Sequence, residues 1–274
     1  MKQKIKIGFL GAGKMAEALL SGLIHSRLYS PKEIGVSDCD PVRVRLLKSR
    51  YRVVGFQKNS DLIQKTKILL LAVKPQSMKE LLEEIRPLLR KDQLIITIAA
   101  GLPVSFYKKY LKDSFPIVRT MPNNPALVRS GITALFAPAP VSQSQKKTAE
   151  KILAAVGKTV WVFGEKDLDA VTAVSGSGPA YFYAVFESMI RSGQKMGLSK
   201  ETVRKLVLET ALGAAKMAIE TGEDPKILRQ WVTSKKGTTE AAFKVLDRKK
   251  WSQSLEEALK AAKKRSRELQ TSLR

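Results

Sequence analysis

The sequence predicts an α/β protein in which a doubly wound parallel sheet is followed by an all-helical domain. Two observations predict this class. From residue 5 to about residue 163, short apolar strands alternate with amphipathic helical stretches, the rhythm of strand–helix–strand units. After Gly164 the strand pattern stops, and the helical remainder carries Ala- and Gly-rich runs that allow close helix packing. We therefore expect domains over residues 1–164 and 165–274.

Short apolar runs give the expected strands of the first domain. They lie at residues 5–11, 33–38, 67–75, 93–101, 115–122, 131–138 and 159–164. Their continuous apolar character is typical of parallel strands that are covered on both faces. In the second domain, Asp224 followed by Pro225 predicts the start of one helix, and Ser254 with Glu257 predicts a capping box for the last helix.

Composition limits the chemistry that this chain can use. With 274 residues and 44% apolar residues, the chain is long enough for two domains without covalent staples. Cys39 and His25 are the only residues of their types, which excludes an internal disulfide and a Cys/His zinc site, and we expect no metal. We expect His25 at the exposed end of the first helix. A reducing, cytoplasmic setting is expected, and proton chemistry must use other groups.

Charge and hydropathy narrow the choice of partners. No apolar run approaches the roughly 18–20 residues that span a bilayer. Residues 1–13 resemble a signal peptide, but Lys14 and Glu17 interrupt the apolar region, and we interpret the segment as a first strand. The formal charge of +24 is dispersed over nearly every helix, which favours a solvated basic surface over a nucleic-acid interface. Such a surface can still attract anionic ligands.

A glycine-rich turn follows the first strand and opens a helix, in the pattern GxGxxA. Gly11 permits the tight turn, Gly13 lets the backbone approach a pyrophosphate, and Ala16 lets the helix approach the strand. Because the motif lies within repeated strand–helix units, it predicts a Rossmann-like dinucleotide-binding domain. The turn residues Gly11, Ala12, Gly13, Lys14 and Met15 are the candidate cofactor contacts.

The second strand ends at Ser37 and Asp38, where an acidic residue usually binds the adenosine ribose and repels a 2′-phosphate. Asp38 therefore favours NADH. Arg43 and Arg45 follow closely enough to offset that preference, and the choice between NADH and NADPH stays open. A large preference for NADPH would indicate that Asp38 is turned away from the ribose.

Six segments, in order along the chain, resemble the pyrroline-5-carboxylate reductases. They are "GFLGAGKMAEALLSGL", "LAVKPQ", "IAAG", "VRTMPNNPALV", "VSGSGPAYFY" and "TSKKGTT". The resemblance implies reduction of the cyclic imine 1-pyrroline-5-carboxylate to L-proline with NADPH or NADH. It also implies a domain-swapped homodimer through the helical domain, which in this family often assembles into decamers.

The resemblance further implies the residues around the two ligands. Near the cofactor it places Asn59, Ala72, Val73, Lys74, Pro75, Ala100, Gly101, Met121, Pro122 and Asn123, with Asn123 also near the substrate. Around the substrate it places Ser234, Gly237, Thr238 and Thr239, with Ser234 and backbone N–H groups on the carboxylate and Thr239 on the ring nitrogen. Asn124 stands where the family usually has Thr. The segments "LAVKP" and "MPNNPALV" also fit a buried strand and a turn, respectively.

The substrate loop departs from the family at Lys235 and Lys236, where the usual pattern is Ser-Pro-Gly-Gly-Thr-Thr. If the second of these positions needs a positive φ, lysine there costs about 1 kcal/mol or more. The two ammonium groups could retain anion binding, alter the imine that is accepted, or mark lost catalysis in a dinucleotide-binding regulator. A solvated pair of side chains is a further alternative.

A hydroxyacid dehydrogenase is the nearest enzymatic rival, because such enzymes join a similar sheet to a helical domain. Their second domain begins with a GxGxxxK signature whose lysine assists alcohol oxidation. This chain has Phe182 at that lysine position, so an alcohol substrate would lack a base. Imine reduction instead requires that the two ligands are oriented, that a carboxylate is recognised and that one hydroxyl donates a proton or hydrogen bond. The sequence contains residues suited to each of these tasks.

Overall fold

The computed structural model describes residues 4–111 and 115–272, which form two compact units. One unit runs up to Ser177 and takes up the chain again from Ala262, and the other is Gly178–Ala261. The units thus divide later in the chain than the boundary expected after residue 164. The last helix contributes to both of them.

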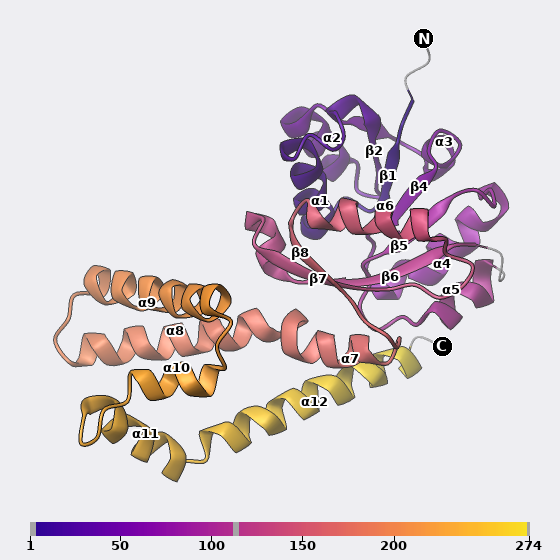
Figure 1. The fold of residues 1–274 in the computed structure, drawn as a ribbon. Coiled ribbons are helices and arrows are strands. Elements are labelled where there is room, and N and C mark those ends of the chain that lie inside the picture. Colours follow the sequence, from indigo (N-terminus) through magenta and orange to yellow (C-terminus); the bar gives the residue numbers. More distant parts are fainter. Residues whose placement is uncertain (1–3, 112–114, 273–274) are drawn as a thin grey trace. The chain divides into compact units, whose positions relative to one another are not determined.

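The first unit contains an eight-stranded sheet with the order β3-β2-β1-β4-β5-β6-β7-β8 (Figure 1). The strands are β1 (Ile7–Leu10), β2 (Ile34–Ser37), β3 (Val54–Phe56), β4 (Ile68–Leu71), β5 (Leu94–Thr97), β6 (Ile117–Pro122), β7 (Gly131–Phe136) and β8 (Gly157–Trp161). The predicted doubly wound sheet is confirmed, with two corrections. The short edge strand β3 was not predicted, and β6 pairs with β7 antiparallel rather than parallel. Only residues 123–130 separate these two strands, which is too short for a parallel crossover.

Helices cover both faces of the sheet. On one face, α1 (Lys14–His25), α2 (Pro41–Tyr51) and α6 (Gln143–Ala154) pack against strand residues such as Phe9 and Val36. On the other face, α3 (Asn59–Ile63), α4 (Met78–Ile85) and α5 (Val104–Leu111) pack against Leu69 and Ile95. Side chains alternate between faces along a strand, so both faces of these strands are apolar, as the sequence predicted. His25 ends α1 and is exposed, as predicted.

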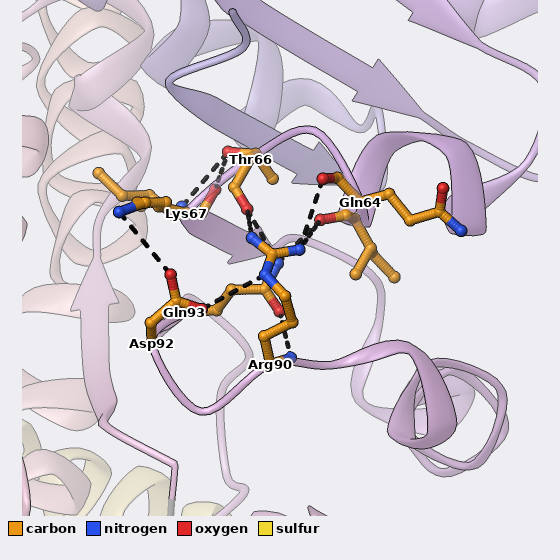
Figure 2. A network of polar contacts seen from close by, with 8 residues as sticks. Gln64, Thr66, Lys67, Arg90, Asp92 and Gln93 are labelled. Atoms are coloured by element: carbon orange, nitrogen blue, oxygen red, sulfur yellow. Dashed lines mark hydrogen bonds and ion pairs between the residues drawn. The ribbon is translucent and has the colours of Figure 1, made fainter.

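A polar network holds together the amino-terminal ends of β4 and β5 (Figure 2). The amide of the buried Gln93 donates to the carbonyl oxygens of Ile63 and Thr66, at 2.8 and 2.9 Å, and accepts from the backbone N–H of Arg90 at 2.8 Å. The guanidinium of Arg90 donates to the Thr66 carbonyl at 3.0 Å and lies 3.3 Å from Asp92. These contacts satisfy buried backbone groups at the edge opposite the carboxyl ends of the strands.

Short helices connect and complete the first unit. They are the 3-10 helices η1 (Pro31–Glu33), η2 (Pro75–Ser77), η3 (Arg86–Leu88) and η4 (Asn124–Val128), the helix α7 (Asp167–Val171) and the π-helical turn η5 (Thr172–Gly176). The end of the last helix also belongs to this unit, where the hydroxyl of Ser266 donates to buried Asp169 at 2.8 Å.

The second unit is built from helices, as predicted. They are α8 (Gly178–Lys195), α9 (Lys200–Thr221), α10 (Pro225–Trp231), α11 (Thr238–Arg248) and the first part of α12 (Trp251–Ser272). Asp224 caps α10 as predicted, by accepting a hydrogen bond from the backbone N–H of Lys226 at 2.7 Å. The predicted capping box of Ser254 with Glu257 is wrong. Helix α12 begins at Trp251, and the hydroxyl of Ser254 donates to the carbonyl of Lys250 inside its first turn.

Large apolar side chains are exposed on α8 and α9. Phe182 is 65% exposed, Leu212 63% and Ile219 81%. A soluble helical unit does not normally leave so much apolar surface uncovered. Among the described residues, no helix combines the length and the apolar character that would be needed to cross a membrane.

Candidate active site

The carboxyl ends of the central strands lie in one row. Leu10, at the end of β1, pairs with Ser37 of β2 and with Leu71 of β4, and Leu71 pairs with Thr97 of β5. The strand order reverses between β1 and β4, since β2 and β3 lie on one side of β1 and β5 lies beyond β4. In open α/β sheets, ligands bind at this switch point, outside the carboxyl ends of the strands.

The glycine turn sits at the switch point. Gly11 has φ 107°, a conformation that favours glycine, and a Cβ there would lie 2.7 Å from the backbone of Ala72. The absence of a side chain thus allows the turn after β1 to contact the segment after β4. The structure brings together two of the predicted cofactor segments at this point.

The start of α1 fits a pyrophosphate. Gly13 is the N-cap and provides no side-chain cap, so the first N–H groups of the helix are left for another acceptor. A Cβ built at Gly13 would meet no atom within 4 Å, which leaves open space over these donors. Lys14 is exposed at the first helical position. Phosphate oxygens are the partners that such a helix start prefers.

Asp38 faces the glycine turn. Its Oδ2 accepts the backbone N–H of Ala12 at 2.5 Å, and its Oδ1 accepts that of Asp40 at 2.8 Å. The Sγ of Cys39 lies 3.5 Å from the same Oδ1, and this hydrogen bond raises the pKa of the Cys39 thiol. The carboxylate is therefore held by the chain's own donors at the adenosine end of the predicted site.

An ion cluster joins α1 to α2. Glu17 accepts hydrogen bonds from Arg43 at 2.8 Å, from Arg50 at 2.7 Å and from Tyr51 at 3.1 Å. Burial alone would raise the pKa of Glu17, but the hydrogen bonds from Arg43, Tyr51 and Arg50 lower it overall. Arg43 also donates from Nε to the carbonyl of Ala12 at 2.9 Å, so it joins α2 to the glycine turn.

The segment after β4 runs from Ala72 to Pro75, where η2 begins, and it exposes the side chain of Lys74. Asn59 starts α3, and its amide donates to both carboxylate oxygens of Glu84, at 3.1 and 3.0 Å. That pairing fixes the position of Asn59.

The strands β5 and β6 present the segments that the resemblance places near the nicotinamide. Ala100 and Gly101 follow β5, and Gly101 has φ 78°. Met121 and Pro122 end β6, and Asn123 follows. The Asn123 Oδ1 accepts the backbone N–H of Ile132 at 2.9 Å. Asn123 thus closes the β6–β7 turn while it lies at the edge of the sheet where ligands bind.

Residues at the end of η5 join this edge, although no site role was predicted for them. Asn123 Nδ2 donates to the hydroxyl of Ser175 at 3.4 Å, and a Cβ on Gly176 would lie 2.5 Å from Met121 Cε. A π-helical turn within a helix is frequently found at functional sites. The sequence signal was the small-residue segment "VSGSG", which the prediction used only to identify the family.

Buried polar groups support the row of strand ends. The hydroxyls of Thr97 and Tyr107 are 2.6 Å apart, and burial raises the pKa of Tyr107, so this phenol stays neutral. Arg119, which is 3% exposed, pairs with Glu165 at 3.0 Å, and Glu165 Oε1 also accepts the backbone N–H of Val104 at 2.6 Å. These contacts position the strand ends and the start of α5.

The second unit carries the predicted substrate loop. The backbone N–H of Gly237 donates to the carbonyl of Ser234 at 3.0 Å, which closes a turn with Lys235 and Lys236 in its centre. Lys236 has φ 61°, so the anticipated strain is present at this position. Its backbone N–H donates to Glu240 Oε2 at 2.7 Å, while the side chains of both lysines are exposed.

Helix α11 starts immediately after this turn and has no side-chain cap. Gly237 is its N-cap, and like Gly13 it provides no side-chain cap. The N–H groups of Thr238 and Thr239 therefore have no acceptor within the helix. Ser234 Oγ lies so close to Gly237 that a Cβ on Gly237 would overlap it. Hydroxyls and helix N–H groups are thus gathered at one point of this unit.

The sheet, the glycine turn and the helical unit define a nicotinamide-dinucleotide oxidoreductase. The family model described as NADP oxidoreductase, coenzyme F420-dependent, matches residues 6–101, and the one described as pyrroline-5-carboxylate reductase dimerisation matches residues 165–269. This chain belongs to the pyrroline-5-carboxylate reductase family, and its cofactor is NAD(P)H.

Named relatives cover nearly the whole chain. The pyrroline-5-carboxylate reductase of Pseudomonas aeruginosa is 42% identical over 264 residues, 96% of each chain, and that of Haemophilus influenzae is 40% identical over 275 residues, 99% of each chain. The solved structure from Coxiella burnetii has a TM-score of 0.90 and 39% identity, over 97% of this chain and 98% of its own. A Plasmodium falciparum structure with NADP bound has a TM-score of 0.89 and 29% identity, over 98% and 99% of the two chains.

Proposed function

We propose that this chain reduces 1-pyrroline-5-carboxylate to L-proline with a hydride from NAD(P)H. The observation that carries the proposal is the open start of α11, where Ser234 and two threonines are gathered in a chain of this family. An uncapped helix N-terminus binds a carboxylate through N–H groups and the helix dipole. The donors of the loop thus suit a substrate that carries a carboxylate, and the family supplies the cyclic imine.

In the reaction, the hydride moves from the nicotinamide to the imine carbon, and the π-electron pair of the C=N bond goes to nitrogen. The nitrogen takes up one proton, so that it holds one proton more than in the neutral imine. One imine, one NAD(P)H and one proton give one proline and one NAD(P)⁺. We assign the ring nitrogen to the hydroxyl of Thr239, and the carboxylate to Ser234 and the backbone N–H groups of Gly237, Thr238 and Thr239. No strong base is required, which suits a chain whose one histidine lies exposed at the end of α1.

Lys235 and Lys236 support this function more than they oppose it. Their backbone still forms the turn that leads into α11, and their ammonium groups add positive charge to the exposed surface of this loop. The turn keeps its donors, and the relatives named above are pyrroline-5-carboxylate reductases, so neither an altered imine substrate nor a non-catalytic regulator is favoured. Replacing both lysines by Pro-Gly tests their part in catalysis, because unchanged kinetics would identify them as bystanders.

The direct test of residue roles is a pair of matched variants. Thr239→Val removes the hydroxyl assigned to the ring nitrogen, and we expect kcat for the imine to fall by about 100-fold. Thr233→Val, in the same loop, removes a hydroxyl that donates to the carbonyl of Arg229 at 2.6 Å, and it should leave kcat unchanged. Equal kcat in wild type and Thr239→Val would overturn the assignment.

The same proposal includes a homodimer through the helical domain. Its support is the dimerisation family match and the exposed apolar surface of α8 and α9, where Phe182, Leu212 and Ile219 need a cover. Light scattering that gave a stable monomer at micromolar concentration would contradict it. Assembly into a decamer and a cytoplasmic location stay predictions.

A further inference from the structure

The loop between β5 and α5 carries Ala100 and Gly101, the residues that the family resemblance places near the nicotinamide. It spans residues 98–103, and both Gly101 and Leu102 in it are buried. Gly101 has φ 78°, and a Cβ there would lie 3.3 Å from Leu269 Cβ. The loop thus packs closely against the end of α12, and its position depends on the contacts that hold its two ends.

Two buried hydroxyl groups hold the ends of this loop together. Thr97 is the last residue of β5, Tyr107 lies in α5, and each is 0% exposed. Their hydroxyl oxygens are 2.6 Å apart. Thr97 Oγ1 also accepts the backbone N–H of Ala99 at 3.3 Å, and the Thr97 carbonyl accepts the hydroxyl of Thr120 at 2.9 Å. The hydroxyl of Tyr107 therefore holds the side chain that in turn holds the backbone next to Ala100.

Tyr107 itself is unsuited to proton transfer. Burial raises the pKa of its phenol, which stays neutral, and a side chain with no exposed surface has no contact with either ligand. Phenylalanine would fill the same space without a polar group that needs a partner. What the tyrosine hydroxyl adds is its contact with Thr97.

A second polar contact holds the other end of the loop. Glu165 Oε1 accepts the backbone N–H of Val104, at the start of α5, at 2.6 Å, and Glu165 pairs with Arg119 at 3.0 Å. Arg119 lies in β6, directly opposite Thr97. Both ends of the loop are thus tied to neighbouring positions of the sheet, and the Thr97 end is the one closer to Ala100 along the chain.

We infer that Tyr107 is a positioning residue for the nicotinamide, acting through Thr97 and the backbone of Ala99. The inference rests on the proposed function, in which Ala100 and Gly101 lie beside the nicotinamide. Hydride transfer depends on the distance between the reacting atoms, and a displacement of about 1 Å can lower a rate by about 100-fold. Without the tyrosine hydroxyl, Thr97 and the loop after it are held less firmly.

The test compares hydride transfer with binding. Tyr107→Phe removes the hydroxyl and keeps the ring, and we expect the rate of hydride transfer in a single turnover to fall by about tenfold. Calorimetric titration should show NAD(P)H bound about fivefold more weakly, the equivalent of one lost hydrogen bond. The adenine fragments 5′-ADP and 2′,5′-ADP lack the nicotinamide and should bind as they do to the wild type. A purely structural role would lower Tm without separating the whole cofactor from its fragments.

Tyr110→Phe is the matched control. It removes the same hydroxyl from the same helix, three residues further on, where the ring of Tyr110 packs against that of Phe106 with centroids 5.1 Å apart. That hydroxyl has no part in the contacts of Thr97. Tyr110→Phe should therefore change neither the rate of hydride transfer nor any of the affinities.

Thr97→Val tests whether Tyr107 acts through Thr97. It should give the same pattern with a larger loss, because it also removes the acceptor for Ala99, and adding Tyr107→Phe should lower the rate no further. An unchanged rate in Tyr107→Phe, equal losses for NAD(P)H and its fragments, or additive losses in the double variant would overturn the inference. If the wild type binds NAD(P)H without reducing the imine, the proposed reaction fails, and the binding comparison still decides the role of Tyr107.

Discussion

The turn at Lys235 and Lys236 predicts that removing one lysine side chain stabilises the protein. The variant Lys236→Gly removes the lysine side chain and changes the conformational preference of the backbone at residue 236. The hydrogen bond from the backbone N–H of residue 236 to Glu240, at 2.7 Å in the present chain, is retained. The side chain of Lys236 is exposed, so little packing is lost.

The magnitude follows from the φ of 61° at Lys236. A left-handed conformation costs an L-residue roughly 1–2 kcal/mol, whereas glycine adopts it freely. Glycine in turn loses more backbone entropy on folding, roughly 0.5–1 kcal/mol relative to alanine. The net gain is roughly 0.5–1 kcal/mol in the free energy of unfolding, or roughly 1–4 °C in Tm for a protein of this size.

Lys235→Gly is the matched control for this prediction. It removes the same charge from the neighbouring turn position, whose φ is not positive. Glycine there brings only the entropic cost, so the free energy of unfolding should fall by about 0.5–1 kcal/mol. Denaturant unfolding followed by tryptophan fluorescence, to which Trp231 in the adjacent helix α10 contributes, gives the midpoint of each variant. A lower midpoint for Lys236→Gly, or equal shifts in the two variants, would refute the reasoning from φ.

Three further predictions concern charge. Arg119→Met leaves Glu165 without its partner at 3.0 Å and should lower the free energy of unfolding by about 3–5 kcal/mol. The double variant with Glu165→Gln should recover part of this loss, and a double variant that recovers nothing would count against the pairing. The pKa of Glu17 is lowered in the folded protein, so the ionised carboxylate stabilises the fold at pH values above 4.5, its ordinary pKa. This contribution is lost as the pH falls through the lower pKa of the folded state. The Tm difference between wild type and Glu17→Gln should therefore be largest near neutral pH and close on acidification; a constant difference would contradict it. With a formal charge of +24, kcat/KM for the anionic imine should fall as salt is raised from low ionic strength, and a salt-independent value would exclude steering by the basic surface.

Much of the first unit could be predicted because its signals are local. The continuous apolar strands and the glycine turn each follow from a few adjacent residues, and Gly11 indeed has a positive φ. The antiparallel pairing of β6 with β7 was also available, since residues 123–130 leave no room for a crossover helix. The edge strand β3 has only three residues, Val54–Phe56, and gives too short a pattern to recognise.

The rest depends on contacts between distant residues. The hydrogen bond between Asp38 and Ala12, 26 positions apart, could not be read from the sequence. The same holds for the ion cluster of Arg43 and Arg50 with Glu17, because Glu17 is far from both arginines in the chain. Ser254 was assigned to a cap because its spacing to Glu257 fits, whereas α12 already begins at Trp251.

A crystal structure of the protein with NADP⁺ and L-proline would test the central claim most directly. The account predicts the pyrophosphate over Gly13 at the start of α1, and the proline carboxylate on Ser234 and the first N–H groups of α11, within hydride-transfer distance of the nicotinamide. A pyrophosphate bound elsewhere, or a proline carboxylate away from α11 in every subunit, would contradict it.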